Sequence, residues 1–208
     1  MKIHDISHTI RSNMAVWPGD TPFSRTLTAK MEEGDAYNSS AVTMSLHAGT
    51  HLDAPAHYLP GACTVDRVDL AVLVGPAELL TVRPDPASGL RARDLEKCLS
   101  ARPPRLLLRA NPPTDLTEFP YSFVPLTGEA AEAIVAAGVG VLGIDSPSVD
   151  PFGSPALPVH QTLGKRGVII LENLCFHDIP DGRYTLVALP LKIEAGDGSP
   201  VRAVLIEE

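Results

Sequence analysis

Short apolar runs separated by glycine- and proline-rich stretches recur along the whole chain, and this pattern predicts many short strands. The clearest run is rich in β-branched residues and covers residues 167–171, directly before Glu172. Residues 105–109 and 139–145 are also apolar, as expected of strands buried in a sheet. Further strands are expected at residues 2–7, 24–30, 41–46, 72–82, 184–191 and 201–206. Within one of them, Gly75-Pro76 predicts a bend or a bulge.

Segments with helical spacing lie between these runs. In residues 90–100 the apolar side chains fall on one side of a helix. A second helix is expected to begin after Thr127, whose hydroxyl can cap the first turn, and to end at Gly138. A third segment, residues 155–166, contains His160 and is expected to form a short helix or a turn.

Length and composition indicate an ordinary globular domain. We expect residues 1–208 to form one domain with a substantial core. Strands outnumber helices, and at least two helices lie between strands, which predicts an α/β or α+β chain with a mixed sheet. The net charge of −8 argues against nucleic acid or an anionic membrane surface as a partner.

The cysteines and the N-terminal residues bear on location. The three cysteines are odd in number and form no C-x-x-C pair, so we expect no disulfide framework and a reducing, cytoplasmic location. The first residues contain no long apolar run of the kind found in an export signal. No stretch approaches the roughly 18 consecutive apolar residues of a membrane span.

Candidate metal-ligating side chains are most closely spaced in residues 47–58. His47, His51, Asp53 and His57 fall within eleven residues and are separated by small or apolar residues. Imidazole and carboxylate are the usual ligands of zinc and of manganese-like metals. Glycine and proline within the stretch favour a strand that runs into a tight loop, in which His51 and Asp53 point the same way. The alternative is a surface loop that happens to carry histidines.

Two motifs carry a resemblance to a known family. The sequence His47-Ala48-Gly49-Thr50-His51-Leu52-Asp53-Ala54-Pro55-Ala56-His57 resembles the HxGTHxDxPxH signature of the metal-dependent cyclase and amidohydrolase family. Tyr58 follows where many members carry Phe. The segment from Trp17 to Phe23 resembles the WPGDTPF segment of bacterial kynurenine formamidases, a branch of this family. The likeness extends over almost the whole chain.

The resemblance implies a fold and a metal site. The fold is the swivelling β/β/α fold with a partly closed mixed β-barrel, assembled as a homodimer or a tetramer. Two divalent ions are implied, with zinc preferred and manganese as the alternative, about 4 Å apart and bridged by carboxylates. The implied ligands are His47, His51, Asp53, His160 and Glu172. From the sequence alone, His160 could equally be structural, and Glu172 could turn outward at a strand end.

The resemblance also implies an activity. It predicts metal-dependent hydrolysis of N-formyl-L-kynurenine to L-kynurenine and formate, with a small aryl formamide as the substrate. His57 would be the general acid and base, and Trp17 would line the substrate site, although a lone tryptophan is also often a core residue. Two alternatives remain open: another cyclic-amide or ester hydrolase, such as an isatin hydrolase, and a metal-binding module without catalysis. No G-x-S-x-G or P-loop motif is present, which weighs against a serine nucleophile or a P-loop nucleotide site.

Overall fold

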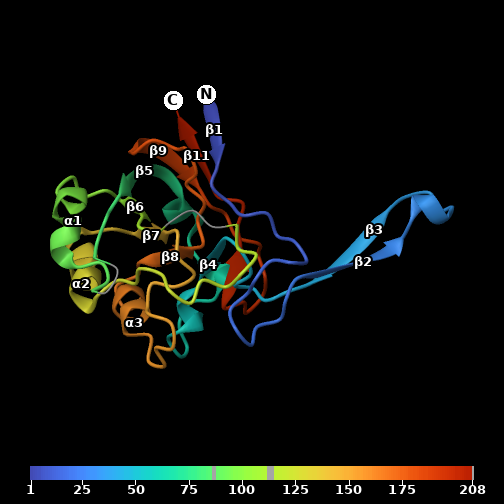
Figure 1. Cartoon of the computed structure of the whole chain (residues 1–208), viewed down its shortest axis with the longest axis horizontal. Helices are drawn as coiled ribbons and strands as arrows, with labels where there is room; N and C mark the ends of the chain where they lie inside the picture. Colours follow the sequence, from blue (N-terminus) through green and yellow to red (C-terminus); the bar gives the residue numbers. More distant parts are fainter. Residues whose placement is uncertain (86–87, 112–114, 208) are drawn as a thin grey trace.

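A curled mixed sheet forms the body of the molecule in the computed structural model (Figure 1). The structure describes residues 1–85, 88–111 and 115–207. Within these residues the sheet has nine strands in the order β1-β11-β9-β5-β6-β7-β8-β4-β10. The predicted mixed α/β class is confirmed. The strands are β1 (Lys2–Asp5), β4 (His51–Asp53), β5 (Val74–Thr81), β6 (Arg105–Arg109), β7 (Val141–Ile144), β8 (Ile169–Glu172), β9 (Gly182–Val187), β10 (Gly198–Pro200) and β11 (Val204–Glu207).

The centre of the sheet is parallel and its two flanks are antiparallel. Strands β5, β6, β7 and β8 run parallel, whereas β9 on one side and β4 on the other run against them. The crossovers between the parallel strands contain α1 (Ala92–Leu99), α2 (Gly128–Ala137) and α3 (Pro158–Gly164). These helices lie on one side of the sheet in Figure 1. None of the described helices is long and apolar enough to span a bilayer.

Both faces of the central strands are buried. Successive side chains of a strand point to opposite faces. In β6, Leu106 and Leu108 therefore join the core beneath the helices, whereas Leu107 joins the core on the opposite face. In β8, Ile170 packs on the helix side, and Leu171 packs on the other side. The continuous apolar runs in the sequence are explained by this burial on two faces.

The helix boundaries agree with their sequence signals. The Thr127 side chain accepts a hydrogen bond from the Ala130 amide, and Gly138 ends α2 in the left-handed conformation with a φ of 80°. His160 lies in the first turns of α3, within the segment predicted to be a helix or a turn.

The predicted bend or bulge at Gly75-Pro76 is wrong. Strand β5 runs through both residues and keeps a regular register with β9, in which Gly75 lies opposite Leu186. The glycine is needed for another reason: its φ is +134°, and a Cβ there would lie 3.0 Å from Nη1 of Arg105. The buried Arg105 guanidinium donates to carbonyl groups around the start of β5, including that of Val72 at 2.6 Å.

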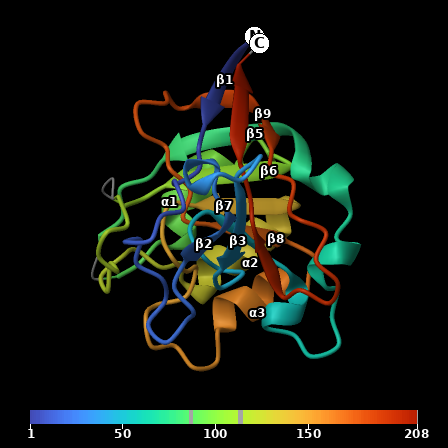
Figure 2. The same cartoon turned by 90° about the vertical axis from the view of Figure 1, so that its right-hand side faces the viewer.

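Two predicted strands form a separate arm. Strands β2 (Ser24–Ala29) and β3 (Ser39–Thr43) pair only with each other and project from the body on the side away from the helices (Figures 1 and 2). The prediction of a strand over residues 41–46 is therefore only partly correct, because β3 ends at Thr43. The strand within the histidine stretch is β4, and turns at residues 44–50 separate it from β3.

One strand lies where the sequence suggested only a connection. Residues 196–200 contain β10, which pairs antiparallel with β4 and places Gly198 opposite Asp53. The last strand, β11, begins only at Val204. Strand β4 is thus held between β8 and β10, and its side chains are fixed from both sides.

Candidate metal centre and substrate pocket

The register between β4 and β8 builds the centre of the site. It places His51 directly opposite Glu172, and Asp53 two residues farther along β4 opposite Ile170. His51, Asp53 and Glu172 are all buried. His51 Nε2 lies 3.2 Å from Asp53 Oδ1 and 3.6 Å from Glu172 Oε2. The alternatives of a surface loop for the histidines and of an outward-pointing Glu172 are both wrong.

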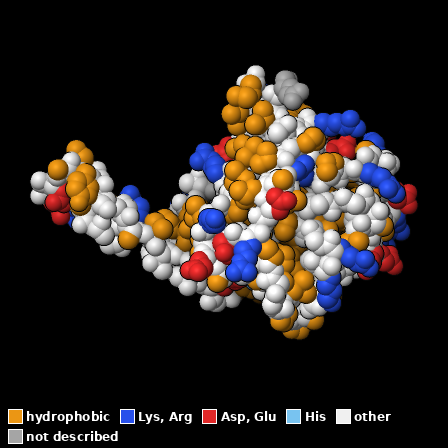
Figure 3. All heavy atoms as spheres, turned by 180° about the vertical axis from the view of Figure 1, so that it is seen from behind, with side chains coloured by type: hydrophobic (Ala, Val, Ile, Leu, Met, Phe, Trp, Pro, Cys, Tyr) orange, Lys and Arg blue, Asp and Glu red, His pale blue; other side chains and the backbone are white. Residues whose placement is uncertain are grey.

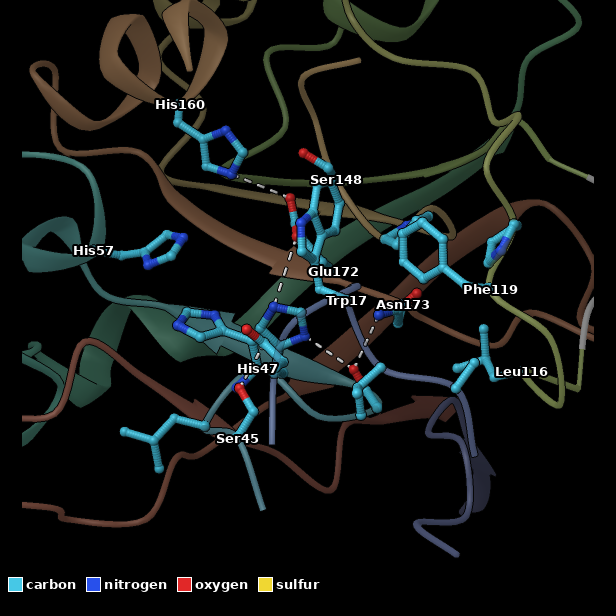
Figure 4. A pocket seen from close by; sticks show the side chains of 18 of the residues that line it. Trp17, Ser45, His47, His57, Leu116, Phe119, Ser148, His160, Glu172 and Asn173 are labelled. Carbon is cyan, nitrogen blue, oxygen red and sulfur yellow. Dashed lines mark hydrogen bonds and ion pairs between the residues drawn. The ribbon is translucent and has the colours of Figure 1, made fainter. Parts of the chain in front are cut away.

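Two further histidines complete the cluster. His160 reaches in from α3, and its Nε2 lies 3.3 Å from both Asp53 Oδ2 and Glu172 Oε1 (Figure 4). His47 precedes β4, and its Nδ1 lies 2.8 Å from Asp53 Oδ1. The five residues that the family resemblance implied as ligands therefore lie together, with Asp53 between the three imidazoles.

The outer nitrogen of each of these imidazoles faces a hydrogen-bond acceptor. His51 Nδ1 lies 2.9 Å from the Gly49 carbonyl, and His160 Nδ1 lies 2.7 Å from Asp150 Oδ2. His47 Nε2 lies 3.2 Å from Asp197 Oδ2. An N–H donated outward leaves the lone pair of the other ring nitrogen directed at the centre, as in metal sites where a second group fixes the tautomer of a histidine ligand.

Sequence reasoning missed Asp150 and Asp197. Asp150 is fully buried and also accepts hydrogen bonds from the amides of Val159 and His160 at the start of α3. The only local signal was a carboxylate a few residues before a helix that begins with proline. Asp197 is distant in sequence from the histidine it contacts, so nothing local could have identified it.

Within the cluster, the pKa values of Asp53, His47 and His160 are each shifted in favour of the charged form. Burial raises the pKa of Asp53, but the imidazoles of His160, His47 and His51 outweigh burial and hold this pKa well below its usual range. Burial lowers the pKa of His47, but Asp53 and Asp197 overcome it and raise the pKa to about 9. For His160, burial is likewise outweighed, because Asp150, Asp53 and Glu172 raise its pKa well above normal.

The residues present fit a divalent metal. Asp53 Oδ2 is buried and makes no hydrogen bond of good geometry, although His160 Nε2 is close. A buried carboxylate needs a cation or several donors to offset its lost hydration. Ligand atoms of His51, Asp53 and Glu172 lie within 4.8 Å of one another, as do those of His47, Asp53 and His57. Nitrogen and oxygen donors at this spacing can hold zinc or manganese.

His57 lies at the edge of the cluster. It ends a short 3₁₀ turn, Pro55–His57, and its ring centroid is 4.1 Å from that of His47. Burial is the main cause of a lowered pKa, so the ring is neutral near pH 7. Its geometry suits either a proton carrier or an additional ligand, because it belongs to one of the two groups that could hold an ion.

A cavity of about 450 Å³ opens onto the cluster. Trp17 and Phe119 line it on the side facing the histidines, with ring centroids 5.2 Å apart in an edge-to-face arrangement (Figure 4). Phe152 packs against both of these rings. No lysine or arginine occurs among the described residues that line the cavity, whereas Asp20 and Asp197 do.

A turn at Pro18-Gly19 places Trp17 at the cavity. The Asp20 amide donates to the Trp17 carbonyl at 2.9 Å, and Gly19 has a φ of 101°. The Asp20 carboxylate accepts a hydrogen bond from Ser45 Oγ, which in turn accepts one from the His47 amide. The turn is thereby tied to the metal cluster. Phe119 comes from a loop with no chemical motif, and sequence reasoning missed it.

Comparisons with known proteins agree with this site. The family model named Cyclase matches residues 4–151. A kynurenine formamidase of Bacillus thuringiensis (strain Al Hakam) is 40% identical over 97% of this chain and 95% of its own length. A second, of Bacillus cytotoxicus, is 39% identical with the same coverage.

Solved structures share the fold. A structure described as a predicted metal-dependent hydrolase from Bacillus stearothermophilus is 28% identical, covers 98% of this chain and 97% of its own, and has a TM-score of 0.79. Isatin hydrolase A from Labrenzia aggregata covers 100% of this chain and 94% of its own with a TM-score of 0.83. At 23% identity, the second likeness shows the fold alone. The family match and the near full-length relatives show that the chain belongs to the cyclase family.

Proposed function

We propose that the protein is a metal-dependent arylformamidase that hydrolyses N-formyl-L-kynurenine to L-kynurenine and formate. The observation that carries this proposal is the 40% identity to kynurenine formamidases over 97% of the chain. The five-residue cluster at the floor of the cavity, of which four residues are buried, supports it. Isatin hydrolysis is the weaker alternative, because the likeness to an isatin hydrolase is one of fold. A cavity lined by aromatic rings and His57 argues against a metal-binding module without catalysis.

We propose two divalent ions, with zinc preferred over manganese. His47, His51, Asp53 and Glu172 would hold the first ion, and Asp53, His160 and Glu172 the second. The Val149 amide donates to Glu172 Oε1 at 2.8 Å and so orients this shared carboxylate. When bound, such ions lower the pKa of water toward neutrality and polarise a carbonyl oxygen.

His57 would move the proton. Hydrolysis adds the oxygen of water to the formyl carbon and breaks the bond from this carbon to the aniline nitrogen. His57 would accept a proton from the attacking water and return it to the departing nitrogen, as its neutral state in the free protein allows. His57 would therefore be neutral again at the end of the reaction.

The cavity suits the proposed substrate. The aromatic ring of formylkynurenine would lie against Trp17 and Phe119, where edge-to-face and offset contacts are favourable. The substrate also carries an ammonium group and a carboxylate. The acidic lining, which includes Asp20 and lacks lysine and arginine among the described residues, favours the ammonium group.

The first prediction concerns the reaction and the metal together. The purified, metal-loaded protein should hydrolyse formylkynurenine in preference to isatin when the two are assayed side by side. Chelation should abolish turnover, because the cluster then lacks its ions, and added zinc or manganese should restore it. Asp53→Ala and Glu172→Ala should lower the bound metal measured by elemental analysis, whereas Glu96→Ala on the exposed face of α1 should not. Full activity in a preparation shown to be metal-free would refute the proposal.

The second prediction concerns Trp17. Aromatic contact is worth about 0.5–1.5 kcal/mol beyond area burial, so Trp17→Ala should raise KM for formylkynurenine by at least about 2- to 10-fold. Trp17→Phe should recover part of the loss. The free energy of unfolding, measured in urea, should change little, because Trp17 lies at the cavity and is only partly buried. A variant that unfolds while its folded fraction keeps the same KM would instead make Trp17 a core residue.

The third prediction concerns His57. General acid–base assistance is typically worth about 10²–10⁴ in rate, so His57→Asn and His57→Ala should lower kcat within that range. Metal content and fold should be retained, because the other five residues fill the proposed coordination spheres. Measurements of kcat and bound metal on the same samples decide between the two roles. Loss of metal in proportion to activity would identify His57 as a ligand.

We also propose that the protein is a homodimer in which the arm contacts a second copy. The arm, β2 and β3, is a two-stranded ribbon, and such a ribbon is marginally stable alone in water. Met31 and Tyr37 near its tip are 58% and 64% exposed. Figure 3 shows apolar side chains at the end of the projecting arm. A symmetric pair of copies would cover these residues on both arms.

The fourth prediction tests this contact. The protein should have the mass of a dimer by light scattering, and the double variant Met31→Ser, Tyr37→Ser should shift it toward the monomer. Leu70→Ser removes a side chain of similar exposure outside the arm and should leave the mass unchanged. A wild-type monomer, or an equal effect of both variants, would contradict the proposed contact.

A further inference from the structure

One carboxylate oxygen lies between two histidines with different proposed roles. Asp197 Oδ2 is 3.2 Å from His47 Nε2 and 3.5 Å from His57 Nδ1. The two rings are neighbours, with centroids 4.1 Å apart. We propose that Asp197 is a positioning residue that fixes the tautomer and the orientation of both rings at once. For His47 this inference rests on the geometry of the metal cluster, and for His57 it also rests on the proposed function.

The chain holds Asp197 in place through its backbone. The Asp197 carbonyl accepts a hydrogen bond from the Ala54 amide at 2.9 Å, and the Gly196 carbonyl accepts one from the Val65 amide at 2.8 Å. Directly after it, β10 pairs with β4. The segment carrying Asp197 is therefore attached to the strand that carries His51 and Asp53.

The glycines on both sides of Asp197 allow this close approach. A Cβ on Gly198 would lie 2.7 Å from His47 Cε1, and one on Gly196 would lie 2.8 Å from a methyl group of Val65. Both distances are shorter than side-chain contacts allow. The segment thus packs directly against the His47 ring, and any larger residue at Gly198 would displace the ring or the strand.

The contact with Asp197 determines which ring nitrogen of His47 can bind metal. Its Nδ1 lies beside Asp53 in the centre, so a proton on Nε2 that is donated to Asp197 leaves Nδ1 free to bind metal. The outer nitrogens of His51 and His160 likewise face the Gly49 carbonyl and the Asp150 carboxylate. Asp197 completes a set in which every ligand histidine has one nitrogen occupied from outside.

The same oxygen, Asp197 Oδ2, also favours one tautomer of His57. The 3.5 Å distance favours a proton on His57 Nδ1, directed toward Asp197 Oδ2, and this tautomer leaves Nε2 as the basic nitrogen. A carboxylate behind a catalytic imidazole holds the ring in one tautomer and stabilises the imidazolium that forms during proton transfer. Among the described residues, the side chain of Asp197 contacts these two histidines, so Asp197 would act on the reaction mainly through the two rings.

A structural role in holding the loop is carried by another residue. Asp66 accepts hydrogen bonds from the Ala195 amide at 3.2 Å and from Thr64, and it touches neither histidine. Removing the Asp66 side chain therefore loosens the same loop without removing the acceptor between the rings. The chain thus offers a matched control that separates the shape of the loop from the contact with the histidines.

The test compares Asp197→Ala, Asp197→Asn and Asp66→Ala in the metal-loaded protein. Loss of a residue that orients a ligand typically costs about 10- to 100-fold in metal affinity or activity, and we expect losses of this size in kcat and in zinc affinity for Asp197→Ala. KM for formylkynurenine should change less than kcat, because the proposed role of Asp197 is exerted through the rings. Asp197→Asn keeps one acceptor oxygen and should recover part of the loss. Asp66→Ala should keep the kcat and zinc affinity of the wild type.

A spectroscopic readout makes the result independent of turnover. In ¹⁵N-histidine NMR spectra, the Nδ1–H tautomer of His57 should be present in the wild type and in Asp66→Ala, and should lose its dominance in Asp197→Ala. If the wild type fails to hydrolyse formylkynurenine, the proposed function falls, while zinc affinity and tautomer still decide on Asp197. Unchanged zinc affinity and tautomer in Asp197→Ala would overturn the inference. Equal losses in Asp66→Ala would also overturn it.

Discussion

The structure depends on how two buried carboxylates are neutralised. Asp53 and Glu172 lie on adjacent strands in the interior, and in the ion pairs of the described chain histidines are their only cationic partners. Placing such charges in a core without compensation costs several kcal/mol per ion. A divalent cation held by these side chains, as proposed, would offset this cost and use the same lone pairs. The proposed metal would then stabilise this core as well as supply chemistry.

This requirement explains why most of the proposed ligands lie on short, well-paired elements. Strand β4 has three residues, yet it is bonded to β8 on one side and to β10 on the other. Helix α3 is one-and-a-half to two turns long, and Asp150 fixes both its first amides and the ring of His160. Each ligand is thus held by backbone pairing and by a second polar group. Such support is needed because a displacement of about 1 Å can remove much of the activity of a site.

The sequence predicted those parts of the site that are local. His47, His51 and Asp53 could be identified as candidates because they lie close together in the sequence. Helix α2 could be predicted because its cap is formed by residues within the first turn. The roles expected of His160 and Glu172 came from the family resemblance, because their contacts with His51 and Asp53 span more than 100 residues along the chain.

The residues that sequence reasoning missed, and the predictions that were wrong, both depend on long-range contacts. Asp197 meets its histidines only through the pairing of β10 with β4, and this strand is too short and too rich in glycine to give a periodic signal. At Gly75-Pro76, local propensity indicated a bulge, but the guanidinium of Arg105 and the register with β9 determine a continuous strand. The proposed metal cluster and the proposed substrate contacts are also separate in the fold: most of the cluster lies on β4, β8 and α3, with His47 in the turn before β4, whereas Trp17 and Phe119 come from loops. Loops can change while strands preserve the chemistry, so an isatin hydrolase can share this fold, and the fold alone cannot identify the substrate.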